Sequence, residues 1–339
     1  MRTATLSACL LLTFAAPCAA SCVSPVVQNG SGGLVSGRVV YQDRNPNMND
    51  PSHLHIYDFA AQSRSDLSWT GISRARNAYF SPDGRWLTFT AVFAGAFNVF
   101  LWDTSNPSSS PVDLTPDGTR SEDAKFSFDG NWIVYKRAGD IHALQMDLSV
   151  STTPLQDKAL TTGGALDGSY AEASAPVLAN HNAYVAFSRG SDGTTAPSQL
   201  SVLTLAHGTL DPLVETPIAK DADAIEYYPI LRKGNALFYA RHTFSAAQDQ
   251  IYLRSPDYTA APVRLATNDC TNDNSDPAVV GTNAFIFSND ASGRYLLYLG
   301  NAATGKVWNF SDNPLLNAPL HDLEGADYTP DWVVTHFEI

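Results

Sequence analysis

Residues 76–89 read RNAYFSPDGRWLTF, and residues 122–135 read EDAKFSFDGNWIVY. In both stretches an apolar segment leads into Ser-x-Asp-Gly and then into a second apolar segment that begins close to a Trp. An Asp-Gly pair supplies the positive φ that a tight hairpin needs. The segments after the turns, Trp86–Thr90 and Trp132–Lys136, alternate with the period of two that half-buried strands show. Each stretch therefore predicts two antiparallel strands.

The same pattern returns along the chain at intervals of roughly 50 residues, a length typical of propeller blades. Further strands follow each hairpin, so that each unit reads as four short strands. The residues expected at equivalent places in the first strands are Ala78, Ala124, Pro176, Pro229, Pro277 and Pro330. Repeats of this length and strand content favour a β-propeller over a helical repeat.

The two ends of the chain complement each other. Gly37–Gln42 and His53–Asp58 read as the second and third strands of a unit that has no first strand. A first strand without a unit, Tyr328–Val333, lies at the other end. Joining the two predicts an all-β, six-bladed β-propeller of four-stranded antiparallel blades over residues 34–339, closed by the C-terminal strand. Closure removes the open sheet edges that promote aggregation.

The Phe-Ser-Pro-Asp-Gly-Arg-Trp-Leu-Thr-Phe run that begins at Phe80 resembles the TolB-like β-propeller repeat. The resemblance extends from Leu34 to Val334. It implies a six-bladed propeller, an extracytoplasmic setting in many members, and the binding of proteins or small ligands at the mouth of the central channel. We expect a propeller without the α/β domain that precedes it in TolB itself, because the first strand follows closely on the N-terminal segment.

Residues 1–21 predict an export signal peptide, with Arg2 followed by an apolar run and then by small residues. That run is too short to span a bilayer, and no later segment reaches about 18 consecutive apolar residues. We therefore expect an extracytoplasmic protein without a transmembrane span, either periplasmic or secreted. Two alternatives stay open: ordinary cleavage that leaves residues 22–33 as a tail, or a lipoprotein signal in which Cys22 is acylated and anchors the protein to the outer membrane.

Two cysteines remain after Cys9 and Cys18 are assigned to the signal. In an oxidising compartment Cys22 and Cys270 can pair, which would fasten the N-terminal tail to the propeller. If Cys22 is acylated instead, Cys270 stays a lone thiol. The chain has no C-x-x-C pair, so the sequence gives no support for a zinc or redox site on cysteines.

The composition bounds the function. The chain has 339 residues, with 21 Lys and Arg against 34 Asp and Glu, and a net charge of −13. Hydrophobic residues make up 44% and charged residues 16%, which suits a large core and argues against disorder. An acidic chain without a basic stripe does not fit a nucleic-acid partner. The sequence also contains no G-x-S-x-G, H-E-x-x-H, P-loop or G-x-G-x-x-G motif.

Acidic residues occur just before five of the six predicted first strands. In a propeller these positions surround one mouth of the channel, so we expect a binding site there. The candidate residues are Arg76, Glu122, Asp123, Glu172, Glu226, Tyr227, Asp276, Asp327 and Tyr328. Clustered carboxylates recruit a cation, hydrogen-bond a polyol, or hold protons with a raised pKa. The alternative is that they cap turns by accepting hydrogen bonds from backbone N–H groups.

A second oxygen-rich segment follows the first predicted strand. Asp43, Asn45 and Asn47 alternate as calcium ligands do, but the segment lacks the Gly and the Glu of an EF-hand, and a solvated loop is the alternative. A structural calcium ion is the one cofactor that the sequence suggests. His53 and His55 would share one face of a strand, but the sequence does not identify a third ligand for a metal.

We therefore expect an exported binding or scaffold propeller that recognises a protein segment or an extracellular glycan at an acidic channel mouth. The alternative is a propeller enzyme, a polysaccharide lyase or a glycoside hydrolase. Oligogalacturonate lyases resemble this repeat family but rely on histidines at the mouth. Here only His321 lies near one of the segments that precede the first strands.

Overall fold

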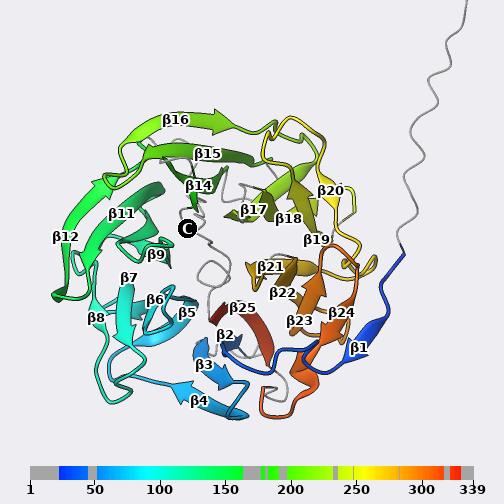
Figure 1. The fold of residues 1–339 in the computed structure, drawn as a ribbon, viewed down its shortest axis with the longest axis horizontal. Helices are drawn as coiled ribbons and strands as arrows, with labels where there is room; N and C mark the ends of the chain where they lie inside the picture. The colour runs from blue at the N-terminus through cyan, green and yellow to red at the C-terminus, as the bar shows by residue number, and fades with distance from the viewer. Residues whose placement is uncertain are drawn as a thin grey trace, which may run out of the picture.

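Six sheets stand around a central axis as the blades of a propeller, with the first strand of each blade nearest the axis (Figure 1). The structure is a computed structural model that describes residues 23–44, 52–162, 177–179, 182–190, 197–231, 236–246, 248–281, 283–316 and 321–329. Within blades 2 to 6 the four strands of the blade are antiparallel neighbours in chain order, whereas in blade 1 the C-terminal strand precedes β2, β3 and β4. The predicted all-β, six-bladed fold is confirmed.

The first three blades contain the following strands. Blade 1 consists of β25 (Asp322–Thr329), β2 (Arg38–Arg44), β3 (His53–Asp58) and β4 (Ser63–Leu67). Blade 2 consists of β5 (Ser73–Phe80), β6 (Trp86–Phe93), β7 (Ala96–Asp103) and β8 (Val112–Asp113). Blade 3 consists of β9 (Ser121–Phe126), β10 (Trp132–Arg137), β11 (Asp140–Asp147) and β12 (Ser151–Ala159).

The other three blades repeat the plan. Blade 4 consists of β13 (Val177–Ala179), β14 (Asn182–Arg189), β15 (Gln199–Ala206) and β16 (Pro212–Pro217). Blade 5 consists of β17 (Ala224–Leu231), β18 (Leu237–Thr243), β19 (Asp249–Arg254) and β20 (Val263–Arg264). Blade 6 consists of β21 (Asn274–Val279), β22 (Ala284–Asn289), β23 (Leu296–Asn301) and β24 (Val307–Asn309), followed by the 3-10 turn Phe310–Asp312. In the described residues no helix has the length and apolar character needed to cross a bilayer.

The ring closes where the C-terminal strand β25 pairs antiparallel with β2, with Tyr328 opposite Val39. This is the predicted closure, but the strand begins at Asp322 rather than at Tyr328. The register identifies Ala326, not Pro330, as the equivalent of Ala78. Buried acids and a glycine interrupt the apolar alternation in β25, and this interruption hides the strand in the sequence. Residues 330–333 lie outside the described residues.

The predicted Asp-Gly hairpins are confirmed, and Ser81 shows how such a turn is held. The Gly84 N–H donates to the Ser81 carbonyl at 2.8 Å, and the Trp86 N–H donates to Ser81 Oγ at 2.8 Å. Gly84 has φ +70°, a conformation that a side chain disfavours. A Cβ there would also lie 2.6 Å from Thr329 Oγ1 of the closing strand. The turn therefore supports both its own hairpin and the closure.

An aromatic residue at the same position of each second strand fills the space between blades. These residues are fully buried: Tyr41, Phe89, Tyr135, Phe187, Tyr239 and Phe287. Alternation places them on one face of the sheet, where each packs in the apolar layer between neighbouring blades. Burying one such side chain contributes roughly 1.5–3 kcal/mol. The core of this protein therefore lies between the blades.

The N-terminal tail adds a fifth strand to blade 6. Strand β1 (Val27–Asn29) pairs in parallel with β24 at the outer edge of that blade (Figure 1). Further upstream, Ser24 Oγ donates to Asp269 Oδ1 at 3.1 Å and accepts from the Cys270 N–H at 3.0 Å. These contacts place the start of the described tail beside Cys270. Cys22 lies outside the described residues, so its pairing with Cys270 stays a prediction.

Candidate functional site at the channel mouth

The predicted mouth residues lie within the first strands, not in the loops before them. Strand β5 contains Arg76, β9 contains Glu122 and Asp123, β17 contains Glu226 and Tyr227, β21 contains Asp276, and β25 contains Asp327 and Tyr328. Glu172 lies outside the described residues. Within a strand, successive side chains point to opposite faces. A ring of acids around the mouth therefore does not follow from their positions.

Five of the first strands carry a β-bulge at the same level, where two residues face one on the next strand. The first residue of each bulge has a positive φ: Asn77, Asp123, Tyr228, Asp276 and Gly325. A bulge bends its strand and redirects the neighbouring side chains. All five residues line a central cavity of about 60 Å³. Of the predicted acids in the described residues, only Asp123 and Asp276 line this cavity.

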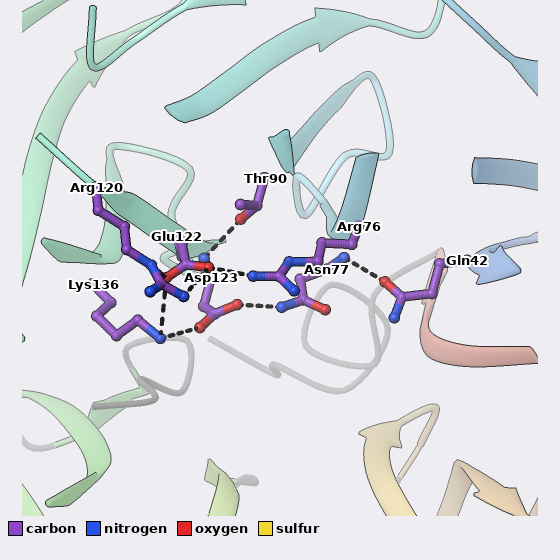
Figure 2. Close-up of polar contacts among 8 residues, drawn as sticks. All are labelled: Gln42, Arg76, Asn77, Thr90, Arg120, Glu122, Asp123 and Lys136. Carbon is purple, nitrogen blue, oxygen red and sulfur yellow. Dashed lines mark hydrogen bonds and ion pairs between the residues drawn. The ribbon is translucent and has the colours of Figure 1, made fainter. Parts of the chain in front are cut away.

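Glu122 stands at the centre of a buried ion cluster between blades 2 and 3 (Figure 2). Its side chain is 2% exposed. Arg120 Nε donates to Glu122 Oε2 at 2.5 Å, and Arg76 also donates to this carboxylate. Lys136 Nζ lies 3.6 Å from Glu122 Oε2. A buried carboxylate is stable only when its charge is paired in this way.

Asp123 extends the same cluster toward the channel (Figure 2). Its carboxylate accepts hydrogen bonds from Lys136 Nζ at 3.1 Å and from the Asn77 side-chain amide. Burial alone would raise the pKa of Asp123, but Lys136 and Lys125 lower it to about 2. Asp123 therefore stays ionised at neutral pH.

Two arginines from this cluster lie over one aromatic ring. The Cζ atoms of Arg76 and Arg120 are 4.5 Å and 5.4 Å from the centre of the Phe97 ring, which comes from β7. The Arg76 side chain is 33% exposed and that of Arg120 is 63% exposed. We call Arg76, Arg120 and Phe97 the arginine cluster. On its buried side both arginines donate hydrogen bonds to the Glu122 carboxylate, and its other side is open to solvent.

One sector of the mouth, in blades 2 and 3, contains more cations than carboxylates. Four cations, Arg76, Arg120, Lys125 and Lys136, surround the two carboxylates of Glu122 and Asp123 in blades 2 and 3. The charge of this sector is therefore 4 − 2 = +2, although the whole chain carries −13. In this sector the cations outnumber the predicted acids, whereas the acidic mouth as a whole stays a prediction. Lys136, on the second strand of blade 3, adds a cation that the predicted mouth residues did not include.

Other predicted acids hold neighbouring elements together. Asp327 Oδ2 accepts a hydrogen bond from the Phe80 N–H of the next blade at 2.8 Å. Glu226 is fully buried, with Arg254 Nη2 at 3.6 Å and Arg241 Nη1 at 4.0 Å from its Oε1. Burial raises the pKa of Glu226 despite these arginines. Tyr328 donates from its hydroxyl to the Ser36 carbonyl at 2.6 Å. These contacts fit the alternative in which acids satisfy buried N–H groups and cations.

Side chains of the preceding blade satisfy the backbone at two bulges. The Asn77 N–H donates to Gln42 Oε1 at 2.8 Å, and the Asp123 N–H donates to Thr90 Oγ1 at 2.9 Å (Figure 2). Gln42 and Thr90 occupy the same position on their second strands. A bulge frees a backbone N–H from the ladder, and a buried donor must find a partner. Asn77 and Asp123 are thus held both by their own strands and by hydrogen bonds to the preceding blade.

Comparisons with known proteins found no matching protein-family model and no matching curated protein. Solved structures do match. TolB from Acinetobacter baumannii superposes with a TM-score of 0.63 at 19% identity, over 88% of this chain and 67% of that chain. A chain from a nidogen/laminin complex gives 0.60 at 9% identity, over 87% and 100%. A putative TolB from Agrobacterium tumefaciens gives 0.53 at 12% identity, over 87% and 99%.

The fold is that of a TolB-like six-bladed β-propeller. The identities are low, so the likeness shows the fold and not the function. The TolB-like repeat recognised in the sequence is therefore confirmed at the level of architecture. The site has to be argued from its own residues.

Sequence reasoning missed three members of this TolB-like propeller's mouth, Asn77, Phe97 and Lys136. A charged residue at Lys136 is unusual, because the same position holds Thr90, Ser188 and Ser288 in other blades. That contrast was available in the sequence. Phe97 gave no such indication, since its contact with two arginines depends on how blades 2 and 3 face each other.

The structure describes one of the three predicted calcium ligands. Asn45 and Asn47 lie outside the described residues, so the calcium loop stays a prediction. Asp43 is described, and it is buried at the end of β2 beside histidines from other segments. The neighbours of its carboxylate are imidazole nitrogens, whereas calcium prefers oxygen ligands.

Proposed function

We propose that this protein is an exported binding scaffold that holds a segment of a partner protein across the channel mouth. The observation that carries the proposal is the arginine cluster, in which Arg76 and Arg120 lie over Phe97 and present exposed guanidinium groups. Export rests on the signal-like residues 1–21. The proposed location is the periplasm or the exterior, with Cys22 either acylated or paired.

The arginine cluster has the composition of a binding hot spot. Arginine and aromatic residues are enriched at the centres of protein interfaces. Glu122 fixes both guanidinium groups before a ligand arrives, so that binding immobilises fewer side chains. These features favour a protein partner over a sugar.

The local charge of +2 indicates which partner segment fits. Carboxylates of acidic side chains or of a chain end form bidentate bonds with guanidinium groups. The remainder of the protein is acidic and repels such a segment, so the positive sector orients its approach. The central cavity, about 60 Å³ in volume, is small compared with a peptide segment. The ligand is therefore held over the mouth. This binding requires no cofactor.

The fold comparisons support a binding role by analogy. A chain of the nidogen/laminin complex, which is an assembly of two proteins, has the same fold over 87% of this chain. Such an analogy raises the expectation of protein binding but does not name a partner.

Capture from an extract of extracytoplasmic proteins tests the proposal. Immobilised mature protein is compared with Arg76→Ala/Arg120→Ala and with Arg120→Ala alone, and bound proteins are quantified by mass spectrometry. The expected result is at least a tenfold loss of captured partner in the double variant. Arg120→Ala leaves Arg76 and Lys136 on Glu122, so it tests binding in a protein whose buried carboxylate is still paired.

The matched control is Arg85→Ala. Arg85 also lies over an aromatic ring, 4.8 Å from the centre of Trp86, and pairs with Asp103 at 3.0 Å, but it belongs to a hairpin away from the mouth. Capture should be unchanged in this variant. Equal capture by the double variant and the wild type rejects the arginine cluster as the site. Retention on a polysaccharide panel without protein capture would instead support the glycan alternative.

A further inference from the structure

Three histidines converge on one buried carboxylate at the seam of the ring. His55 Nε2 and His321 Nδ1 each lie 3.1 Å from Asp43 Oδ2, and His53 Nδ1 lies 3.6 Å from Asp43 Oδ1. Asp43 and His55 are 4% and 6% exposed. The sequence singled out Asp43, His53 and His55 but found no third histidine. The fold supplies it from 278 positions along the chain.

The four residues come from three segments of blade 1 that meet at the closure. Asp43 lies on β2, opposite His53 on β3. His55 follows two positions later, so its side chain shares a face with that of His53. His321 immediately precedes the closing strand β25, which pairs with the other side of β2. An ion bound here would therefore tie both ends of the propeller to one centre.

A second carboxylate orients the central histidine. His55 Nδ1 lies 2.8 Å from Asp66 Oδ1, and Arg64 Nε lies 2.8 Å from the same oxygen. The Nδ1 contact directs Nε2 toward Asp43. A carboxylate on the far nitrogen is the arrangement that fixes the ring and the tautomer of metal-binding histidines in proteins. Asp66 is 65% exposed, so its main structural contribution is this orientation.

Within the described part of the chain, two buried atoms of this group make no hydrogen bond of good geometry: Asp43 Oδ1, and His55 Nε2 despite its 3.1 Å distance from Asp43 Oδ2. Both belong to side chains that are more than nine-tenths buried. Buried polar atoms without partners are uncommon because their desolvation is not compensated. Here both atoms face the region where the other donors converge. A bound ion would satisfy them together.

The donors contact one another instead of surrounding a vacant centre. Among the described residues no three His, Cys, Asp or Glu side chains form a ready-made metal-binding group. The distances from the three histidines to Asp43 are nevertheless close to those between two ligands that share an ion. Zinc bonds of about 2.0–2.1 Å in a tetrahedron place neighbouring donors roughly 3.4 Å apart, and the measured distances are 3.1–3.6 Å. Binding thus requires small ring rotations, and His53 is exposed enough to admit the ion.

We propose that His53, His55, His321 and Asp43 form a Zn²⁺ site that clamps the closure of the propeller. Three imidazoles and one carboxylate suit a divalent transition ion, whereas Ca²⁺ prefers an all-oxygen shell. The ion displaces protons from the imidazoles or from water and joins β25 to β2 and β3. The site is separate from the arginine cluster, and neither proposal depends on the other.

Metal binding by the untagged mature chain tests the site. After EDTA treatment and dialysis, Zn²⁺ is titrated by calorimetry, and Co²⁺ is added separately to read the coordination geometry from its visible spectrum. We expect one Zn²⁺ per chain, a tetrahedral Co²⁺ spectrum, and a rise in Tm of about 4 °C at a Zn²⁺ concentration 100 times the Kd. The absence of Zn²⁺ binding in the wild type, or stoichiometric binding of Ca²⁺ in its place, overturns the proposal.

Variants assign the ion to these residues. His55→Gln/His321→Gln should lower Zn²⁺ affinity at least 100-fold, and Asp66→Asn should lower it 10–100-fold by releasing the His55 ring. Each variant is first checked by its metal-free melting curve, and the glutamines keep the size and polarity of the histidines. The matched control is His242→Gln, which removes a histidine paired with Asp249 in blade 5. Undiminished binding in the double variant, or an equal loss in the control, places the ion elsewhere.

Discussion

Asp123 shows how a single buried residue is kept charged. Its carboxylate lies between Lys136 and the Asn77 amide, and the nearby lysines hold its pKa at about 2. Glu226 has a different environment, in which burial raises the pKa and the arginines lie at 3.6 and 4.0 Å. Glu226 lies two positions before Tyr228, which is the equivalent of Asp123 in β17. The surroundings of the two acids, and not their residue type, decide the charge.

Because the pKa of Asp123 is lowered in the folded protein, the free energy of unfolding depends on pH in the acidic range. The pKa in the unfolded chain is 3.8, so ionised Asp123 stabilises the folded state above that value by roughly 2 kcal/mol. This contribution is lost as the pH falls from about 4 to 2. In urea denaturation the wild type should therefore lose more stability over this range than Asp123→Asn does. Parallel loss in the two proteins would contradict the assignment, and Asp129→Asn, in an exposed turn, serves as the control.

At the scale of strands, a β-bulge decides which residues of five first strands face the channel. The first residues of the five bulges have positive φ and surround the channel. The bulges also free two backbone N–H groups, which donate hydrogen bonds to Gln42 and Thr90 of the neighbouring blade. Proline follows the first bulge residue at Pro229 and Pro277. A proline is tolerated there because the bulge removes that position from the ladder.

The bulge register predicts where a new proline is accepted. Ala326 is the equivalent of Pro229 and Pro277, so Ala326→Pro should change the free energy of unfolding by less than about 1 kcal/mol. Leu323→Pro should cost about 3 kcal/mol or more, because the Leu323 N–H donates to the Tyr295 carbonyl at 2.9 Å. Thermal and urea melts measure both. Equal destabilisation would show that Ala326 does not occupy a bulge.

Two turn glycines separate backbone strain from packing at the closure. Gly130→Ala should cost about 1 kcal/mol, since φ is +72° and the space around a Cβ is open. Gly84→Ala should cost at least about 1 kcal/mol more, because its Cβ would meet the buried Thr329 side chain of β25. Urea denaturation of the two variants gives the difference. Identical values would mean that this turn does not support the closing strand.

At the scale of the molecule, both chain ends are fastened to the ring. The C-terminal strand β25 completes blade 1, and the N-terminal strand β1 covers the outer edge of blade 6. The proposed Zn²⁺ site lies at the first of these junctions. Ser24, beside the Cys270 loop, lies at the second. Closure gives blade 1 its fourth strand, and the tail protects the outer edge of blade 6.

The position of Ser24 supports the predicted pairing of Cys22 with Cys270. In the mature protein made under oxidising conditions, we expect one disulfide by mass spectrometry of non-reduced peptides. Cys270→Ser should then lower stability by about 3 kcal/mol, or Tm by about 4 °C, because the crosslink restricts the unfolded chain. The same substitution should have no such effect on reduced protein. Two free thiols, or a lipid on Cys22, would contradict the pairing.

The sequence by itself determined the blades, their number and the closure of the ring. Asp-Gly turns and period-two alternation act between residues that are close along the chain, so they are readable without a structure. The tertiary structure alone decided the bulges, the approach of Arg76 and Arg120 to Phe97, and the meeting of His321 with Asp43. Such contacts depend on how separate blades face one another, and a shift of one position in a strand turns a side chain to the opposite face.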